Sequence, residues 1–327
     1  MCMANIEEKI REYLKGLPLG TLNLSGSDQL VVVRVGGGDY NLNFKISAGD
    51  TNFLLRLNVE SQSGLENQIE YEYKTLQFLS SHNIAPHPLY LDNSKKLFEQ
   101  GLLIEEFIKG KTLVFSVEVM KRTARTLAKL HTIPIAQASF FMKWSNPLRQ
   151  QFEAVNESMR KYRQRKTANH EIIQIGDAFL KSMREKLASL ESFFSPKSII
   201  HTDLVPSNFV DDDEDVFLLD WEKARIDDPS YDIAVFFSRL ANLWDSPRVL
   251  TDEEKTVFLS EYVSITKDET IQDRTEKRLA LSTLHGILWA AGRISDVEEG
   301  VISEQLGSQN YERYKKIIDI QDLQKFL

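Results

Sequence analysis

The pattern of hydrophobic residues changes near residue 108, and this change constrains the fold more than any other feature of the chain. Before it, β-branched runs and alternating apolar residues predict strands over residues 29–35, 41–46, 51–58, 89–93 and 101–108. Gly49, between two of these strands, predicts a hairpin turn. Amphipathic periodicity predicts a helix over residues 65–80, and a further helix over residues 1–20.

Beyond residue 108 the sequence becomes mainly helical. Helical periodicity covers residues 117–133, two long charged stretches within 147–191, and most of the chain after Pro229. Short apolar strands flank polar loops within residues 198–210 and 215–224. We therefore predict an α+β protein of two lobes. A β-rich lobe with one main helix spans residues 1–107, and a mostly helical lobe spans residues 108–327.

Composition excludes several classes of protein. The 327 residues fit about two domains. A net charge of −8 disfavours a broad nucleic-acid-binding surface. Cys2 is the only cysteine, so neither an internal disulfide nor a CxxC metal site can form. No secretory signal or membrane-spanning run is recognisable, and we expect a cytoplasmic protein without a membrane partner. The sequence leaves monomer and homodimer open.

The segment from His201 to Asp220 carries the strongest chemical signal. Asp203 and Asn208 lie on one predicted loop, and a hairpin over residues 208–219 is expected to return the chain to Asp220. One carboxylate there can take a proton from a hydroxyl group. The other carboxylate and the amide are hard oxygen ligands that suit Mg²⁺. Phosphoryl transfer depends on such positioning and charge neutralisation.

This motif, His-x-Asp-x4-Asn followed by Asp220-Trp221-Glu222, resembles the aminoglycoside-phosphotransferase superfamily. That superfamily includes choline, ethanolamine, methylthioribose, homoserine and thiamine kinases, and it has a protein-kinase-like fold. The resemblance implies that Asp203 is the catalytic base and that Asn208 and Asp220 hold Mg²⁺. It also implies that His201 is structural and that Asp232 supports the catalytic loop. The alternative is that His201 and Asp203 only cap a junction between a strand and a helix.

The β-rich lobe contains matching parts for a nucleotide. The glycine-rich loop at residues 36–41 resembles the family's nucleotide-binding loop, so Gly37, Gly38 and Asn41 are expected near the phosphates. A plain glycine hairpin is the alternative. Arg56 stands where kinases carry the lysine that binds phosphate. Its expected partner is Glu72, with Glu70 as the alternative.

The segment at residues 101–113 resembles the hinge between the lobes of the family. Adenine is expected to bond to backbone groups from Glu106 to Ile108, with Ile104 behind the base. Because backbone groups make these bonds, the sequence does not distinguish ATP from GTP. His131, at the end of a helix that also resembles the family, is interpreted as a packing residue.

The acceptor site is the least defined part. Trp289 and Glu222 are candidate substrate-site residues. Choline kinases cage a quaternary ammonium with tryptophans on a comparable helix. In this chain, Gly286 stands where a second tryptophan is expected. Core packing is the alternative role for Trp289. A basic cluster either clamps an anionic substrate or forms a solvated helix face; its members are Arg149, Arg160, Lys161, Arg163, Arg165 and Lys166.

Together these features predict a kinase that uses ATP and Mg²⁺ to phosphorylate a hydroxyl group of a small molecule. The expected acceptor is an amino alcohol, an aminoglycoside, a sugar or a similar compound. Two alternatives stay open. One is a protein-kinase-like regulator, which the absence of an extended activation segment after Asp220 disfavours. The other is a non-catalytic nucleotide-binding module.

Overall fold

The structure is a computed structural model, and it describes residues 3–17, 22, 30–36, 41–58, 65–98, 101–301 and 304–327. The chain divides into two compact units. The first comprises Met1–Lys111 and Val210–Ala224, and the second comprises Thr112–Phe209 and Arg225–Leu327. The segment from Val210 to Ala224, which follows the predicted catalytic loop, therefore belongs with the β-rich part of the chain. Its role in binding nucleotide stays a prediction.

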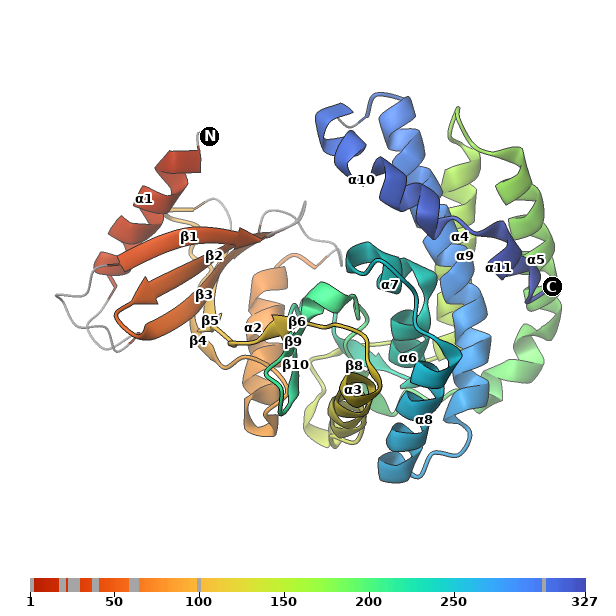
Figure 1. The fold of residues 1–327 in the computed structure, drawn as a ribbon, viewed down its shortest axis with the longest axis horizontal. Coiled ribbons are helices and arrows are strands. Elements are labelled where there is room, and N and C mark those ends of the chain that lie inside the picture. The colour runs from red at the N-terminus through yellow and green to blue at the C-terminus, as the bar shows by residue number, and fades with distance from the viewer. Residues whose placement is uncertain are drawn as a thin grey trace. The chain divides into compact units, whose positions relative to one another are not determined.

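The first unit is built on a five-stranded antiparallel sheet with the strand order β1-β2-β3-β5-β4 (Figure 1). Its elements are α1 (Met3–Lys15), β1 (Leu30–Gly36), β2 (Asn41–Ala48), β3 (Thr51–Asn58), α2 (Gln68–Leu79), β4 (Pro88–Asp92) and β5 (Leu102–Glu106). Ala48 pairs with Thr51 across the predicted turn, and Gly49 has the positive φ of 57° that such tight turns require. The hairpin prediction is confirmed.

The two faces of this sheet differ in chemistry. On one face, helix α1 lies against the sheet (Figure 1). Its Ile10 and Leu14 pack against Val32, Phe44 and other apolar strand residues. The other face carries Arg56, which is joined to α2 by an ion pair. Side chains alternate between the faces along each strand, so one sheet has both an apolar core and a polar cluster.

The Val210–Ala224 segment enters the first unit as a hairpin. Strands β9 (Phe209–Asp211) and β10 (Val216–Leu218) form it, and they belong to a small sheet with β6 (Lys111–Thr112). Gly110 lies so close to this hairpin that a Cβ atom there would be 2.4 Å from Val210 Cγ1 and 2.6 Å from the Asp211 carbonyl oxygen. Glycine at residue 110 therefore allows the hairpin to pack against the end of the first segment.

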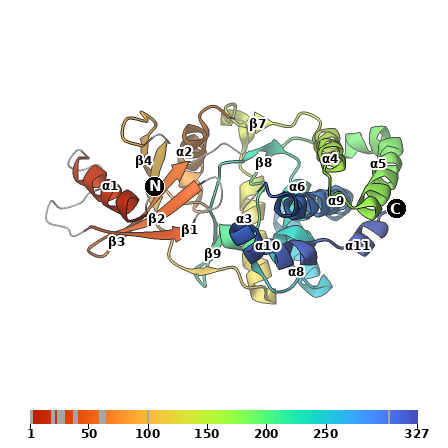
Figure 2. The same cartoon turned by 90° about the horizontal axis from the view of Figure 1, so that it is seen from above.

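The second unit is mainly helical. Its helices are α3 (Val117–His131), α4 (Pro147–Arg163), α5 (His170–Leu190), α6 (Ser230–Phe237), α7 (Arg239–Asp245), α8 (Asp252–Thr266), α9 (Ile271–Glu298), α10 (Glu304–Ile317) and α11 (Ile320–Gln324). Helices α4, α5 and α9 lie side by side (Figure 2) and share a core that includes Phe152, Phe179 and Leu284. The predicted α+β class is confirmed.

A three-stranded sheet in the second unit positions the predicted catalytic loop. Strand β11 (Arg225–Asp227) pairs in parallel with β7 (Met142–Lys143) and in antiparallel with β8 (Ser198–Ile200). The predicted loop containing Asp203 begins where β8 ends. None of the helices in the described part of the chain combines the length and the apolar character needed to cross a membrane.

Candidate active site

Arg56 is the centre of a buried polar cluster in the first unit. Its side chain is 2% exposed. Its Nη1 atom lies 2.8 Å from Glu72 Oε1 on α2 and 2.6 Å from Asp220 Oδ1, in the loop after β10. The expected pairing of Arg56 with Glu72 is present, whereas Glu70 pairs with Lys74 at the surface. The cluster therefore holds a strand, a helix and the Asp220 loop together.

The electrostatic balance of this cluster is negative. Burial alone would lower the pKa of Arg56, but the carboxylates of Asp220, Glu72 and Glu105 raise it well above its ordinary value. Burial raises the pKa of Glu72, and the nearby Asp220 and Glu105 carboxylates add to that effect while Arg56 opposes it. Three carboxylates thus surround one guanidinium group within the described residues. A cation bound beside these carboxylates would lower the electrostatic cost of keeping all three ionised and buried.

Asn41 belongs to a second polar group in the first unit. Its Nδ2 atom donates to Glu222 Oε2 at 2.9 Å, and its Oδ1 atom accepts from Asn58 Nδ2 at 3.1 Å. Gln68 donates to the same oxygen of Glu222. Burial raises the pKa of Glu222, which is 2% exposed. Glu222 therefore supports Asn41, and this position does not favour its predicted contact with substrate. Gly37 and Gly38 lie outside the described residues.

The predicted catalytic loop of the second unit is held by Asp232. Asp232 accepts hydrogen bonds from the backbone N–H groups of His201 and Thr202, both at 2.7 Å. Thr202 has a φ of 79°, which is unfavourable for a β-branched residue. The Asp203 N–H donates to His201 Nδ1 at 3.3 Å, and Asn208 Nδ2 donates to the Asp203 carbonyl oxygen at 2.9 Å. These bonds fix the backbone on both sides of Asp203.

Asp232 is in turn held by His131 on α3, which is itself bonded to Tyr262 on α8. His131 Nε2 lies 3.1 Å from Asp232 Oδ2, and His131 Nδ1 lies 2.9 Å from the Tyr262 hydroxyl. Burial would raise the pKa of Asp232. The hydrogen bond and charge of His131 oppose this effect, as do the charge and backbone N–H group of His201, so the pKa of Asp232 is lowered. His131 therefore packs and also orients Asp232. The sequence did not point to Tyr262, because only the fold brings α8 beside α3.

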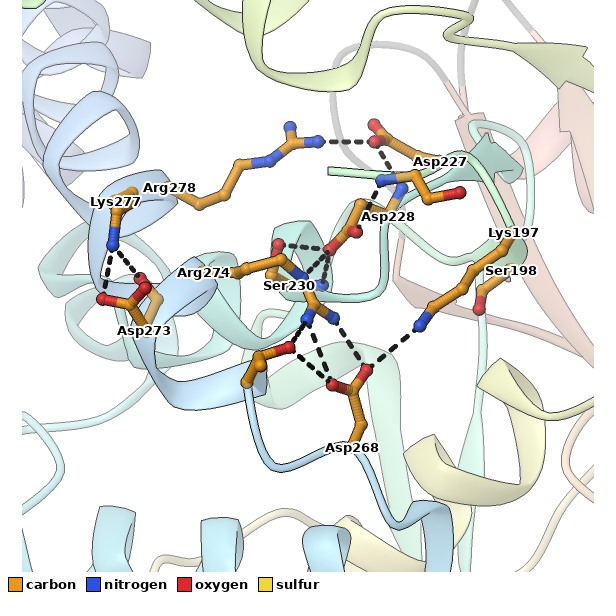
Figure 3. Close-up of polar contacts among 12 residues, drawn as sticks. Lys197, Ser198, Asp227, Asp228, Ser230, Asp268, Asp273, Arg274, Lys277 and Arg278 are labelled. Atoms are coloured by element: carbon orange, nitrogen blue, oxygen red, sulfur yellow. Dashed lines mark hydrogen bonds and ion pairs between the residues drawn. The ribbon is translucent and has the colours of Figure 1, made fainter. Parts of the chain in front are cut away.

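Buried ion pairs fix the start of α6, the helix that carries Asp232. Arg278 Nη2 lies 2.6 Å from Asp227 Oδ1, and both side chains are fully buried. Arg274 Nε lies 3.1 Å from Asp228 Oδ1, which also accepts from Ser230 (Figure 3). Figure 3 further shows Arg274 reaching Asp268, which Lys197 also contacts. This network was not singled out from the sequence; Arg274 and Arg278, four residues apart on one helical face, are the signal that could have indicated it.

The hinge residues differ in part from the prediction. Glu106 and Ile108 are half-buried, and the Glu106 N–H donates to the His87 carbonyl oxygen at 2.9 Å. Ile104, expected behind the base, lies instead in the core beneath α1. The register pairs Arg56 with Leu103, and Leu54 with Glu105. Glu105, not Ile104, therefore shares the face of the sheet that carries Arg56.

The candidate acceptor residues are engaged within the protein. The Trp289 ring packs against Trp244 at a centroid distance of 5.3 Å and against Tyr314 at 5.5 Å. Most of the basic cluster forms ion pairs with acidic side chains, which supports the alternative of a solvated helix face; the pairs are Arg149–Glu191, Arg160–Glu157, Lys161–Glu157, Arg163–Asp177 and Arg165–Asp296. Neither feature is assigned a contact with substrate.

Structural comparison supports the fold. A choline kinase from Cryptosporidium parvum Iowa II aligns over 98% of this chain and 97% of its own, with a TM-score of 0.65 and 18% identity. A choline kinase from Streptococcus pneumoniae aligns over 96% and 99%, with a TM-score of 0.62 and 22% identity. A spectinomycin phosphotransferase solved with ADP and spectinomycin aligns over 91% and 93%, with a TM-score of 0.56 and 14% identity.

Sequence comparison gives the family. No curated protein sequence matches the chain. A model of the phosphotransferase enzyme family matches residues 31–258, which include the whole segment from Arg56 through the Asp203 loop to Asp232. This match covers more than half of the chain and agrees with the resemblance drawn from the catalytic motif. The chain belongs to the phosphotransferase enzyme family.

Proposed function

We propose that this protein is a kinase that transfers the γ-phosphate of ATP, with Mg²⁺, to a hydroxyl group of a small molecule. The observation that carries the proposal is the cluster in which Arg56 binds both Glu72 and Asp220. A guanidinium group held rigidly by two carboxylates is oriented to bind phosphate oxygens. Backbone groups from Glu106 to Ile108 bind the base, and the loop containing Gly37, Gly38 and Asn41 covers the phosphates.

Asp203 is the proposed catalytic base. It orients the acceptor hydroxyl group and takes its proton as the hydroxyl oxygen attacks the γ-phosphorus. Asp232 bonds to the N–H groups of residues 201 and 202, and Asn208 bonds to the Asp203 carbonyl oxygen. These bonds hold the backbone that carries the proposed base. His201 contributes to the loop backbone and not to the chemistry.

Asn208 and Asp220 are the proposed ligands of Mg²⁺. Both offer hard oxygen atoms, and the Asn208 amide uses its Nδ2 atom on the Asp203 carbonyl, which leaves its oxygen as the group for a metal. The excess of carboxylates around Arg56 also favours a cation. Magnesium would neutralise charge on the phosphates. Among the described residues, no group of three or more His, Cys, Asp or Glu side chains is placed to hold a metal ion.

The test is ADP release from ATP and Mg²⁺ in the presence of a panel of amino alcohols, aminoglycosides and sugars. The wild-type protein is expected to release ADP with at least one compound. Asp203→Asn should slow transfer by about 10²- to 10⁴-fold while nucleotide affinity is retained. Asp220→Ala should lose the Mg²⁺ dependence of nucleotide binding. Wild-type turnover in Asp203→Asn, or nucleotide binding without transfer to any compound, would contradict the proposal.

A further inference from the structure

Glu105 is a buried carboxyl group that the proposed chemistry does not use. It lies on β5 and is 1% exposed. Its Oε1 atom is buried and has no hydrogen-bond partner among the described residues. Buried polar groups in folded proteins are almost always hydrogen-bonded, so an exception calls for an explanation. A ligand that supplies the missing donor is one such explanation.

The position of Glu105 relates it to the Arg56 cluster. Glu105 pairs with Leu54, and Arg56 pairs with Leu103, so the alternation of side chains directs Glu105 and Arg56 to the same face of the sheet. Arg56 and Asp220 are also the charged groups with the largest electrostatic effect on Glu105. Glu105 therefore belongs to the polar face proposed to bind the nucleotide, and not to the core beneath α1.

The electrostatics agree with the missing hydrogen bond at Oε1 of Glu105. Burial raises the pKa of Glu105 to about 7, although the charge of Arg56 acts in the opposite direction. The nearby carboxylate of Asp220 adds to the increase. A hydrogen-bond donor placed against Glu105 would stabilise its ionised form.

The proposed function identifies the donor. Glu105 immediately precedes the hinge residues Glu106 to Ile108, which bind the base, and it shares the sheet face with Arg56, which binds phosphate. The edge of the base nearest β5 would therefore meet its side chain. Adenine carries an exocyclic amine at C6, which is a donor, whereas guanine carries a carbonyl oxygen there, which is an acceptor. A carboxylate accepts hydrogen bonds and repels a second acceptor.

We propose that Glu105 accepts a hydrogen bond from the C6 amine of adenine and so selects ATP over GTP. This inference rests on the proposed function, because it requires a nucleotide at the hinge. It concerns a side chain with acceptors only, whereas the hinge backbone offers both donors and acceptors. A hydrogen bond to a charged group corresponds to a preference of about 10- to 100-fold.

The experiment measures the dissociation constants of the full-length protein for three magnesium nucleotides. These are ATP, GTP and purine riboside triphosphate, which lacks the C6 amine. We expect wild-type protein to prefer ATP over both by about 10- to 100-fold. Glu105→Gln can donate to the guanine oxygen as well as accept, so its preference for ATP over GTP should fall below about threefold. The matched control is Glu70→Gln, on the surface of α2, which should retain the wild-type preference.

The outcomes separate this inference from the proposed function. Equal affinity of the wild-type protein for all three nucleotides would overturn the role of Glu105 while leaving the kinase proposal standing. Equal weakening of ATP and GTP by Glu105→Gln would do the same, since it would make Glu105 a counter-charge for Arg56. Absence of binding by any nucleotide would overturn both. The purine riboside comparison needs only wild-type protein, so equal affinity there overturns the role of Glu105 even where a variant fails to fold. A preference for ATP there is assigned to the Glu105 side chain, and not to the hinge backbone, only if Glu105→Gln reduces the preference for ATP over GTP.

Discussion

The Glu72 carboxylate lies 2.8 Å from Arg56 Nη1, and the same nitrogen lies 2.6 Å from Asp220. Both Arg56 and Glu72 are 2% exposed, so water screens this pair weakly. The helix α2 thus sets the orientation of a cation on β3, and the Asp220 loop depends on the same cation. Any loss of the pair is expected to disturb phosphate binding and Asp220 together.

Glu72→Gln is the first predicted change. It keeps the side-chain shape but removes the charge opposite Arg56, so kcat/KM for ATP should fall by at least about tenfold. The free energy of unfolding should fall by about 1–3 kcal/mol, because a buried charged hydrogen bond is weakened. Steady-state kinetics and urea unfolding measure both. The control is Glu70→Gln, which alters an exposed pair with Lys74 and should change neither the kinetics nor the unfolding free energy. Unchanged kinetics in Glu72→Gln would contradict the role given to the Arg56–Glu72 pair.

Local patterns were sufficient to predict much of this arrangement. The strands, α2 and the turn at Gly49 follow from periodicity and from glycine. These elements depend on residues close together in sequence, for which helix and strand periods give the geometry directly. The partner of Arg56 was expected from the family resemblance, with Glu72 first and Glu70 as the alternative, and the structure has the Arg56–Glu72 pair.

Features that depend on strand pairing or on distant segments could not be predicted in this way. Strand β5 is buried on both faces over Leu102–Glu105, so burial does not alternate along it. Its sequence therefore does not tell which residues face α1 and which face Arg56. The error at Ile104 arose there. Strand β11 is only three residues long, and Tyr262 reaches His131 from 131 residues away. Only the assembled fold reveals such contacts.

Tyr262→Phe is predicted to weaken the support of the catalytic loop. It removes only the hydroxyl group 2.9 Å from His131 Nδ1, so His131 orients Asp232 less firmly. We expect a loss of about 1 kcal/mol in unfolding free energy and a kcat reduced severalfold with an unchanged KM for ATP. Tyr311→Phe, at an exposed bond to Glu298, is the matched control. A KM effect as large as the kcat effect would place the role of Tyr262 elsewhere.

Arg278→Met is predicted to destabilise the second unit strongly. Asp227 and Arg278 are both fully buried, so removal of the guanidinium group leaves a buried carboxylate. Among the described residues, Arg225 is then its one remaining ionic partner. The unfolding free energy should decrease by about 3–5 kcal/mol, and a combined Asp227→Asn change should recover part of it. Chemical denaturation measures this. The neighbouring Lys277→Met alters a more exposed pair with Asp273 (Figure 3) and should cost less than about 1 kcal/mol. Equal losses in the two variants would show that burial does not govern the effect.

The pair of Arg248 and Glu254 is predicted to contribute stability that depends on pH. The hydrogen bonds of Arg248 at 2.7 Å are the main cause that lowers the pKa of Glu254 to about 2. Because the pKa is lower in the folded than in the unfolded protein, this contribution is full above about pH 4.5 and is lost as the pH falls through about 2. Arg248 is 44% exposed, so solvent limits the contribution to about 1 kcal/mol or less. Urea unfolding of wild-type protein and Arg248→Gln should differ at pH 6 and converge towards pH 2. A difference that stays constant over that range would mean that the loss comes from packing of the Arg248 side chain on Phe115 and not from the ion pair.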